Sequence, residues 1–231
     1  MSSSRECKKF PALPVTALHS ASVAVQGMPI VCGGKKPDNN QIYTCYINEG
    51  APNYAWRRLT DHIMQRHMHA AVVVGNRVWL TGGVAVVVIS MFQSQTTAVD
   101  RTEFVSMDGT VERGPNLPHY MQNHCMVELK DRRVMILGGN RTIRTSLWKD
   151  NGAEYHHSTN EVLIYQPDTM NFTDGPSMQY NRSSLACAHF YSHMHEGRPV
   201  ALAVGGKEGT AEVLDYTHEN AEWQESKSIL D

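Results

Sequence analysis

The sequence predicts an all-β fold made of four copies of one unit, each a sheet of four short antiparallel strands. Three observations predict this fold. In four segments, two apolar strands flank a polar turn and end at a pair of glycines. A second pair of apolar stretches follows each glycine pair. The strands are rich in Val, Ile, Leu, Tyr and Phe, and no long segment has the 3.6-residue period of a helix.

The first half of each unit carries the glycine pair at the end of its second strand. Glycine suits such a position because backbones can approach closely there and φ can be positive without a Cβ clash. The fourth copy has a longer turn, at residues 192–199. The aligned segments are 19–34, 69–83, 124–139 and 185–206, and the paired glycines are Gly33, Gly34, Gly82, Gly83, Gly138, Gly139, Gly205 and Gly206.

The second half of each unit supplies its two outer strands. Residues 160–172 align with residues 211–223, and this alignment places Tyr165 seven residues before Phe172 and Tyr216 seven residues before Trp223. Residues 102–118 have a shorter turn and residues 42–59 a longer one. The whole chain, 1–231, is therefore predicted to be one repeat domain with units at about 15–62, 63–118, 119–178 and 179–231, residues 1–14 being a stray outer strand of a preceding unit.

This arrangement of glycine pairs and following aromatics resembles the kelch-repeat β-propellers, over nearly the whole chain. The resemblance implies four-stranded blades packed radially, each burying the face of the next. Propellers of this family generally close with more than four blades, so we expect an incomplete arc of a larger propeller. The two open blade faces of such an arc favour self-association.

The resemblance also implies a non-catalytic module that binds a protein partner through loops on one face, as a substrate-recognition component of a cullin-based ubiquitin ligase or an actin-binding scaffold. The long segment after the third glycine pair, residues 140–159, and the loops between blades are the expected surface. Arg, Trp and Tyr are enriched at the energetic centres of interfaces. A solvated, mobile insertion is the alternative. The expected partner-binding residues are His62, Arg66, His67, Tyr120, Arg141, Arg144, Trp148, Lys149, Tyr155, His156, His157 and Arg182.

We expect no catalytic residues, metal or cofactor. His69 begins a repeated strand, aligned with His19 and His124, and His67 lies in the preceding loop. His193 and His195 lie in a different hairpin, so these groups should not converge on a metal. The alternative is a secreted propeller, with or without a copper-radical activity like that of galactose oxidase. That chemistry needs a tyrosine cross-linked to a cysteine, and the adjacent Cys45 and Tyr46 should point to opposite faces of a strand.

Composition bears on partners and compartment. The net charge of -2 argues against broad binding to nucleic acid or to an anionic membrane. The start of the chain has no apolar signal region, and the longest apolar run, 82–92, is about half of a membrane span. Free, buried thiols in the cytoplasm are predicted for Cys7, Cys32, Cys45, Cys125 and Cys187. Extracellular location is the alternative, and Asn140, Asn171 and Asn181 would then be glycan acceptors.

Residues 84–92, "VAVVVISMF", break the pattern because a polar turn is expected after Gly83. Two interpretations stay open. The segment is either a longer strand or buried insertion, or an uncharged, β-branched segment that docks or aggregates.

Overall fold

The structure is a computed structural model that describes residues 11–38, 40–50, 52–90, 93–144, 154–206, 210–218 and 220–226. Within these ranges the chain forms six antiparallel sheets and a single 3-10 helix, η1 (His193–His195). The prediction of an all-β fold is confirmed. No helix of the described residues has the length and apolar character needed to cross a bilayer.

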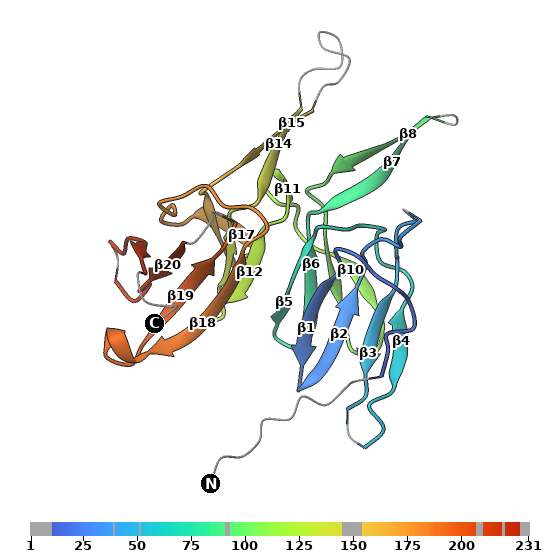
Figure 1. Ribbon diagram of the computed structural model, residues 1–231, viewed down its shortest axis with the longest axis horizontal. Helices are drawn as coiled ribbons and strands as arrows, with labels where there is room; N and C mark the ends of the chain where they lie inside the picture. The colour runs from blue at the N-terminus through green and yellow to red at the C-terminus, as the bar shows by residue number, and fades with distance from the viewer. Residues whose placement is uncertain are drawn as a thin grey trace.

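Four of the sheets have four strands each, ordered in space as along the chain (Figure 1). Sheet one contains β1 (Ala21–Val25), β2 (Met28–Cys32), β3 (Cys45–Asn48) and β4 (Trp56–Thr60). Sheet two contains β5 (Ala70–Val74), β6 (Arg77–Thr81), β9 (Thr102–Val105) and β10 (Val111–Arg113). Sheet three contains β12 (Cys125–Glu128), β13 (Val134–Leu137), β16 (Val162–Gln166) and β17 (Asn171–Asp174), and sheet four contains β18 (Ala186–Ser192), β19 (Arg198–Val204), β20 (Ala211–Leu214) and β21 (Gln224–Glu225).

Two smaller sheets interrupt this repeat directly after glycine pairs. Strands β7 (Val84–Ser90) and β8 (Gln93–Ala98) form a hairpin after Gly83. Strands β11 (Tyr120–Gln122), β14 (Asn140–Arg144) and β15 (Glu154–Ser158) form a three-stranded sheet, of which β14 follows Gly139. Figure 1 shows both projecting from the same end of the molecule. The apolar run after Gly83 is therefore a strand of a separate hairpin.

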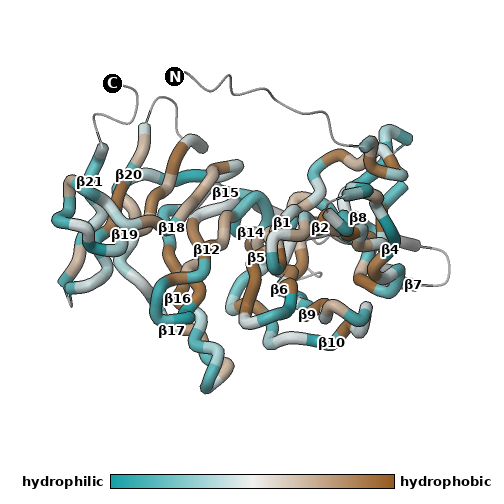
Figure 2. The backbone as a smooth tube through the Cα atoms, turned by 90° about the horizontal axis from the view of Figure 1, so that it is seen from below, coloured by the Kyte–Doolittle hydropathy of each residue, from teal (hydrophilic) through white to brown (hydrophobic). Residues whose placement is uncertain are grey.

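The four-stranded sheets are joined side by side through their first strands. Strand β5 contacts both β1 and β12, and β12 also contacts β18. In Figure 2 these first strands lie in the middle of the molecule and the fourth strands on the outside. Sheets one and four are the two ends of the resulting arc, and a closed ring is not found among the described residues.

A chain of backbone hydrogen bonds links the starts of the four sheets. The amide of Met68 donates to the carbonyl of His19 at 3.0 Å, Asn123 donates to Met68 at 2.8 Å, and Ser184 donates to Asn123 at 2.9 Å. All four residues have a positive φ, between 55° and 57°. They occupy one repeat position, so His19 corresponds to Met68, one position before His69. The sequence alignment of His19 with His69 was wrong by one residue.

The alignment of the outer strands of units three and four needs a correction of two residues. The amide of Gly138 donates to the carbonyl of Glu161, whereas that of Gly205 donates to Thr210, so Glu161 corresponds to Thr210 and not to Glu212. Tyr165 lies opposite Phe172 as expected. Tyr216 instead lies outside the strands, and its hydroxyl accepts a hydrogen bond from the amide of Lys130 at 3.2 Å.

One apolar cluster fills each junction between neighbouring four-stranded sheets. The cluster between sheets two and three contains the largest rings: Trp79 lies 5.5 Å from Phe104 and 4.3 Å from Tyr165, between ring centroids. Successive side chains of a strand point to opposite faces of its sheet, so alternate residues pack into the junctions on the two sides of the sheet. Figure 2 shows hydrophobic residues along the strands and hydrophilic residues at many of the connecting turns. Each fully buried side chain of this kind contributes about 1.5 to 3 kcal/mol.

Four cysteines form two disulfides, Cys32–Cys45 and Cys125–Cys187. Cys32 and Cys45 lie directly opposite each other on β2 and β3, with Cα atoms 4.1 Å apart. Cys125 and Cys187 stand on β12 and β18, the contacting first strands of sheets three and four. The prediction of free thiols is wrong for these four residues, because the fold brings distant cysteines within bonding distance. Cys7 lies outside the described residues.

His69 explains why a glycine from each of two pairs is needed at the junction of sheets one and two. A Cβ on Gly33 of sheet one would lie 2.7 Å from the His69 ring, and a Cβ on Gly83 would lie 2.7 Å from the His69 Cβ. His124 repeats this arrangement between Gly82 and Gly139, at 2.9 and 2.7 Å. The imidazole thus fills the space that the missing side chains leave.

Candidate interaction surface

The three-stranded sheet carries six of the residues predicted to bind a partner, and the side chains of four of them are described. Across β11, β14 and β15, Tyr120 lies opposite Thr142, which lies opposite His156. In the next row Arg141 lies opposite His157. The structure therefore brings Tyr120, from a segment before the glycine pair, onto one small sheet with Arg141, His156 and His157.

The polar side chains of this sheet are held by specific partners. Arg141 Nη1 lies 2.7 Å from Glu161 Oε1, and both side chains are about one third exposed. The hydroxyl of Thr142 lies 2.8 Å from His156 Nδ1. His157 and Ile143 are exposed, Ile143 by 49%. The sheet therefore presents imidazoles and one aliphatic side chain on a braced backbone.

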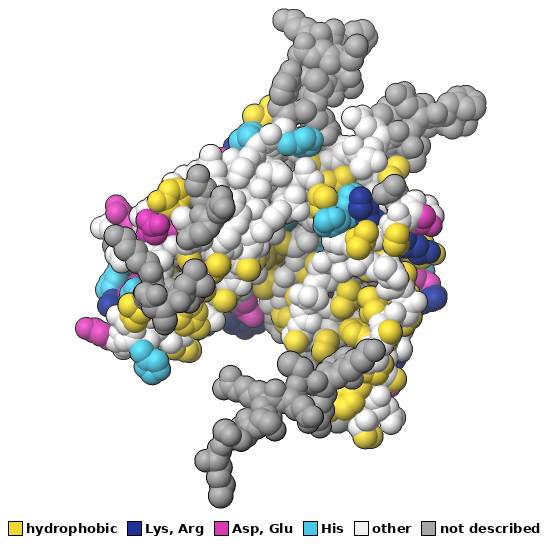
Figure 3. Space-filling model, viewed as in Figure 1, with side chains coloured by type: hydrophobic (Ala, Val, Ile, Leu, Met, Phe, Trp, Pro, Cys, Tyr) yellow, Lys and Arg dark blue, Asp and Glu magenta, His cyan; other side chains and the backbone are white. Residues whose placement is uncertain are grey.

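The β7–β8 hairpin lies beside this sheet, since β8 contacts β11. Its base is fixed by a backbone bridge, in which His67 donates to Val84 at 3.0 Å and Val84 donates back at 2.8 Å. Val84 and Ala85 are buried, but Val86 is 43% exposed. Figure 3 shows hydrophobic side chains at the surface close to the bases of both projections.

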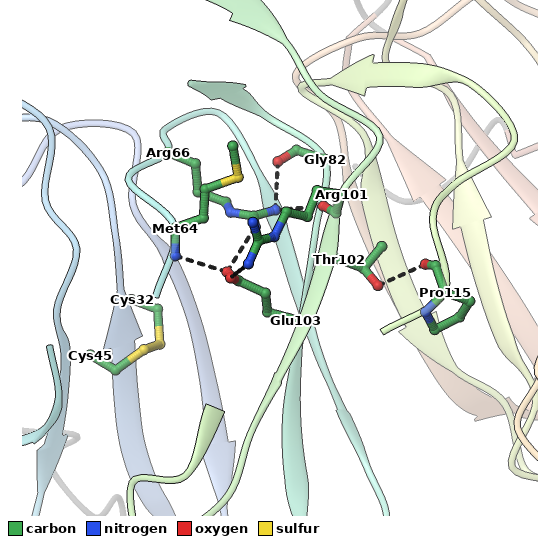
Figure 4. Close-up of polar contacts among 9 residues, drawn as sticks. All are labelled: Cys32, Cys45, Met64, Arg66, Gly82, Arg101, Thr102, Glu103 and Pro115. Carbon is green, nitrogen blue, oxygen red and sulfur yellow. Dashed lines mark hydrogen bonds and ion pairs between the residues drawn. A yellow bond between two sulfur atoms is a disulfide. The ribbon is translucent and has the colours of Figure 1, made fainter. Parts of the chain in front are cut away.

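Arg66 is not part of this surface, and its prediction as a partner-binding residue was wrong. Its side chain is fully buried, with Nη2 2.8 Å from Glu103 Oε2 (Figure 4). Nη1 donates to the carbonyls of Gly82 and Arg101, at 3.1 and 2.7 Å. The second strand, the third strand and the preceding connection of sheet two are thereby joined by one guanidinium. A buried arginine of this kind stabilises the turn and is inaccessible to a partner.

Arg182 repeats this role in sheet four, and its prediction as a partner-binding residue was also wrong. It is fully buried, and its Nε lies 2.8 Å from Glu212 Oε1. Its Nη1 donates to the carbonyls of Gly205 and Thr210, at 2.7 and 3.1 Å. We call Arg66–Glu103 and Arg182–Glu212 the two clamps.

The side chains of the other predicted residues either lie apart from this group or are outside the described residues. His67 is buried, and burial followed by the charge of Lys35 lowers its pKa. His62 is exposed, with Nε2 3.2 Å from Asp61 Oδ1. Arg144 and Tyr155 belong to β14 and β15, but their side chains are outside the described part of the structure, as are the whole of Trp148 and Lys149.

The described part of the chain contains no cluster of side chains arranged to bind a metal ion or to form a tyrosine–cysteine cross-link. No group of three or more His, Cys, Asp or Glu side chains there is arranged to hold a metal ion. His193 and His195 form η1 at the β18–β19 turn of sheet four, and sheet three lies between sheet four and sheet two. Cys45 is bonded to Cys32, so its sulfur is not free to bond to a tyrosine ring.

Comparison with known proteins supports the fold alone. No family model matches the sequence, and no curated protein matches it. The solved structure of YjhT is similar, with a TM-score of 0.68 at 12% identity over 94% of this chain. The match covers 66% of YjhT, so this chain spans somewhat less than two thirds of that protein. An all-β fold compatible with a propeller is what this likeness shows.

The sequence does not predict two features, namely the aliphatic residues of this surface and the two clamps. Ile143 is not among the residues predicted to bind a partner, although an aliphatic residue in a segment expected to be a loop is a detectable signal. Val86 is predicted only as part of the apolar segment 84–92, for which docking is one of two interpretations. The clamps also had a signal: arginine four residues before the first strand recurs with glutamate near the start of the third strand in units two and four.

Proposed function

We propose that this chain is a kelch-type propeller module that binds a protein partner without catalysis, through the two projections formed by β7–β8 and β11–β14–β15. It would act as a recognition or scaffold component. The observation that carries the proposal is that both projections follow glycine pairs of consecutive sheets and leave the same end of the molecule (Figure 1). Loops and hairpins on a rigid scaffold are where such modules bind.

The chemistry of the projections supports a protein partner. Exposed Val86 and Ile143 supply apolar contact area, and His156, His157 and Arg141 supply hydrogen-bond donors around it. An apolar centre with a polar rim is the usual anatomy of a protein interface. The clamps and the backbone bridge at His67 hold the bases of the projections, which reduces the entropy lost on binding.

The second candidate is that this module works outside the cytoplasm, and the two disulfides favour it. Disulfides persist in the secretory pathway and outside cells but are rare in the cytosol. This proposal replaces the cytoplasmic expectation with an oxidising compartment. Mass spectrometry of glycans on Asn171 and Asn181 after expression in a secreting eukaryotic host would support it, and free thiols at all five cysteines in the native protein would overturn it.

The binding proposal is tested by comparing partners captured by the wild-type chain with those captured by Ile143→Asp and Val86→Asp. A matched control is Met170→Asp, which places the same charge at an exposed turn between β16 and β17. We expect a protein that is retained by the wild type and the control and lost by both hairpin variants, followed by at least a tenfold weaker Kd for the purified pair. Equal capture by all four chains would remove the projections from the site.

A further inference from the structure

The four-stranded sheets share a set of three residues that face the next sheet. In sheet one Val23 lies opposite Ile30, which lies opposite Ile47. The same cross-strand rows recur in each of the other sheets. They are Val72, Trp79 and Phe104 in sheet two, Val127, Met135 and Ile164 in sheet three, and Ala188, Leu202 and Val213 in sheet four.

In the first three sheets each row belongs to the apolar cluster that joins the sheet to the next one. Ile30, Trp79 and Met135, at the centre of these rows, are at most 1% exposed. Among the described residues no sheet follows the row of sheet four. Leu202 and Val213 are half-buried, and Phe190 beside them is 39% exposed.

The free face of sheet four is also hollowed. A groove of about 780 Å³ is lined by Phe190, Met194, Val213 and Gln224 among others. Met194 is 80% exposed at its rim. The face therefore has the residue register of an interior junction and an open, largely apolar surface.

Sheet one, at the opposite end of the arc, has the face that would pack against a preceding sheet. The residue that faces the preceding sheet is Leu80 in sheet two, Ile136 in sheet three and Ala203 in sheet four, and each is fully buried. Val31 holds this position in sheet one, between Ser22 and Tyr46, and it is only half-buried. Figure 3 shows hydrophobic side chains gathered over sheet one.

We propose that the free face of sheet four docks on the free face of sheet one of a second copy of the chain. The repeat then continues across the two molecules. A second copy of the chain is the expected partner, because this contact repeats the junction that joins neighbouring sheets three times within one molecule. The chain has both faces that such a junction needs, one on sheet four and one on sheet one. None of the three residues in either row is charged, and the charged Arg58 and Glu225 stand only at the outer edges of the two faces, on β4 and β21. The contact is heterologous, since two different faces meet.

The test is the molar mass of the wild-type chain by light scattering after gel filtration, at several concentrations up to about 100 μM. We expect a mass of twice 25.9 kDa or a larger multiple. A wild-type chain that stays at 25.9 kDa overturns the proposal without any variant being needed.

Two charge variants then identify the faces. Leu202→Asp and Val31→Asp should each give monomers that keep the wild-type circular dichroism. Mixed in equal amounts they should form a dimer, because one molecule keeps an intact sheet four and the other an intact sheet one. Self-association of Val31→Asp alone at the wild-type concentration would overturn the proposal. Val86→Asp, which lies on the β7–β8 hairpin, should leave the mass unchanged, so this result is independent of the binding function proposed above.

Discussion

Arg66 Nη2 and Glu103 Oε2 are 2.8 Å apart, and neither side chain is more than 2% exposed. Arg182 and Glu212 form the same contact in sheet four at 2.8 Å, also without exposure. Glu103 further accepts a hydrogen bond from the amide of Met64 at 3.0 Å, and Glu212 accepts one from Gln179 at 2.6 Å. Each pair thus satisfies backbone groups on three segments of its unit.

Removing one member of a clamp should strongly destabilise the fold. Glu103→Gln leaves the Arg66 guanidinium buried without its counter-charge, and we expect the free energy of unfolding in urea to fall by about 3 to 5 kcal/mol. The matched control is Glu112→Gln, because Glu112 pairs with Arg77 at 2.9 Å but both side chains are exposed. That control should change stability by less than about 1 kcal/mol. Equal effects of the two substitutions would show that the clamp is dispensable.

Acid should weaken the junctions between sheets. Burial and the charge of Arg66 lower the pKa of His124 to about 4, and burial lowers that of His69 well below 6.5. In the unfolded chain both imidazoles take up protons below about pH 6.5, whereas the folded chain does not. The free energy of unfolding therefore falls as the pH drops from about 7 toward 4, by about 3 kcal/mol from His124 alone.

Urea unfolding at several pH values checks this dependence. In His124→Gln the slope between pH 7 and 4 should be smaller than in the wild type, whereas His157→Gln, which changes an exposed imidazole, should keep it. A stability that does not vary over this range contradicts the assignment of His69 and His124 as buried neutral groups.

Gly83→Ala should cost much more than Gly27→Ala, although both glycines have a positive φ, of 90° and 78°. A Cβ at Gly83 would lie 2.6 Å from the carbonyl oxygen of His67, whereas nothing lies within 4 Å of one at Gly27. Gly27→Ala should lose about 1 to 2 kcal/mol from backbone strain alone. Gly83→Ala should lose a further 1 to 3 kcal/mol or so from the clash. Thermal unfolding of the two variants measures the difference.

Reduction should destabilise the chain through both disulfides. Cys125–Cys187 spans 62 residues and Cys32–Cys45 spans 13. Loop-closure entropy gives them about 4 and about 3 kcal/mol respectively. Replacing Cys125 and Cys187 together by Ala should therefore lower the unfolding midpoint more than replacing Cys32 and Cys45. Thiol titration of the denatured, unreduced chain should find one thiol, since five cysteines less four leaves one. Five thiols would refute both bonds.

The sequence predicted the all-β fold and the glycine pairs because both depend on local chemistry. Alternating apolar residues predict strands, and only glycine fits where His69 and His124 pack against the backbone. The sequence also placed Arg141, His156 and His157 in one segment after a glycine pair. It did not predict that this segment pairs with β11, because strand pairing depends on residues far apart in sequence.

The sequence does not predict that Arg66 and Arg182 are buried. An arginine in a connection between sheets is normally exposed, and only the tertiary structure brings Glu103 and Glu212 from the third strands to meet them. The disulfides are the same kind of case, since Cys125 and Cys187 meet only when sheet four packs on sheet three. The sequence by itself determined the repeating strands and turns, because steric fit and hydrophobic periodicity act over a few residues. The tertiary structure decided which polar and sulfur groups are buried and paired, because burial and pairing depend on the packing of neighbouring sheets.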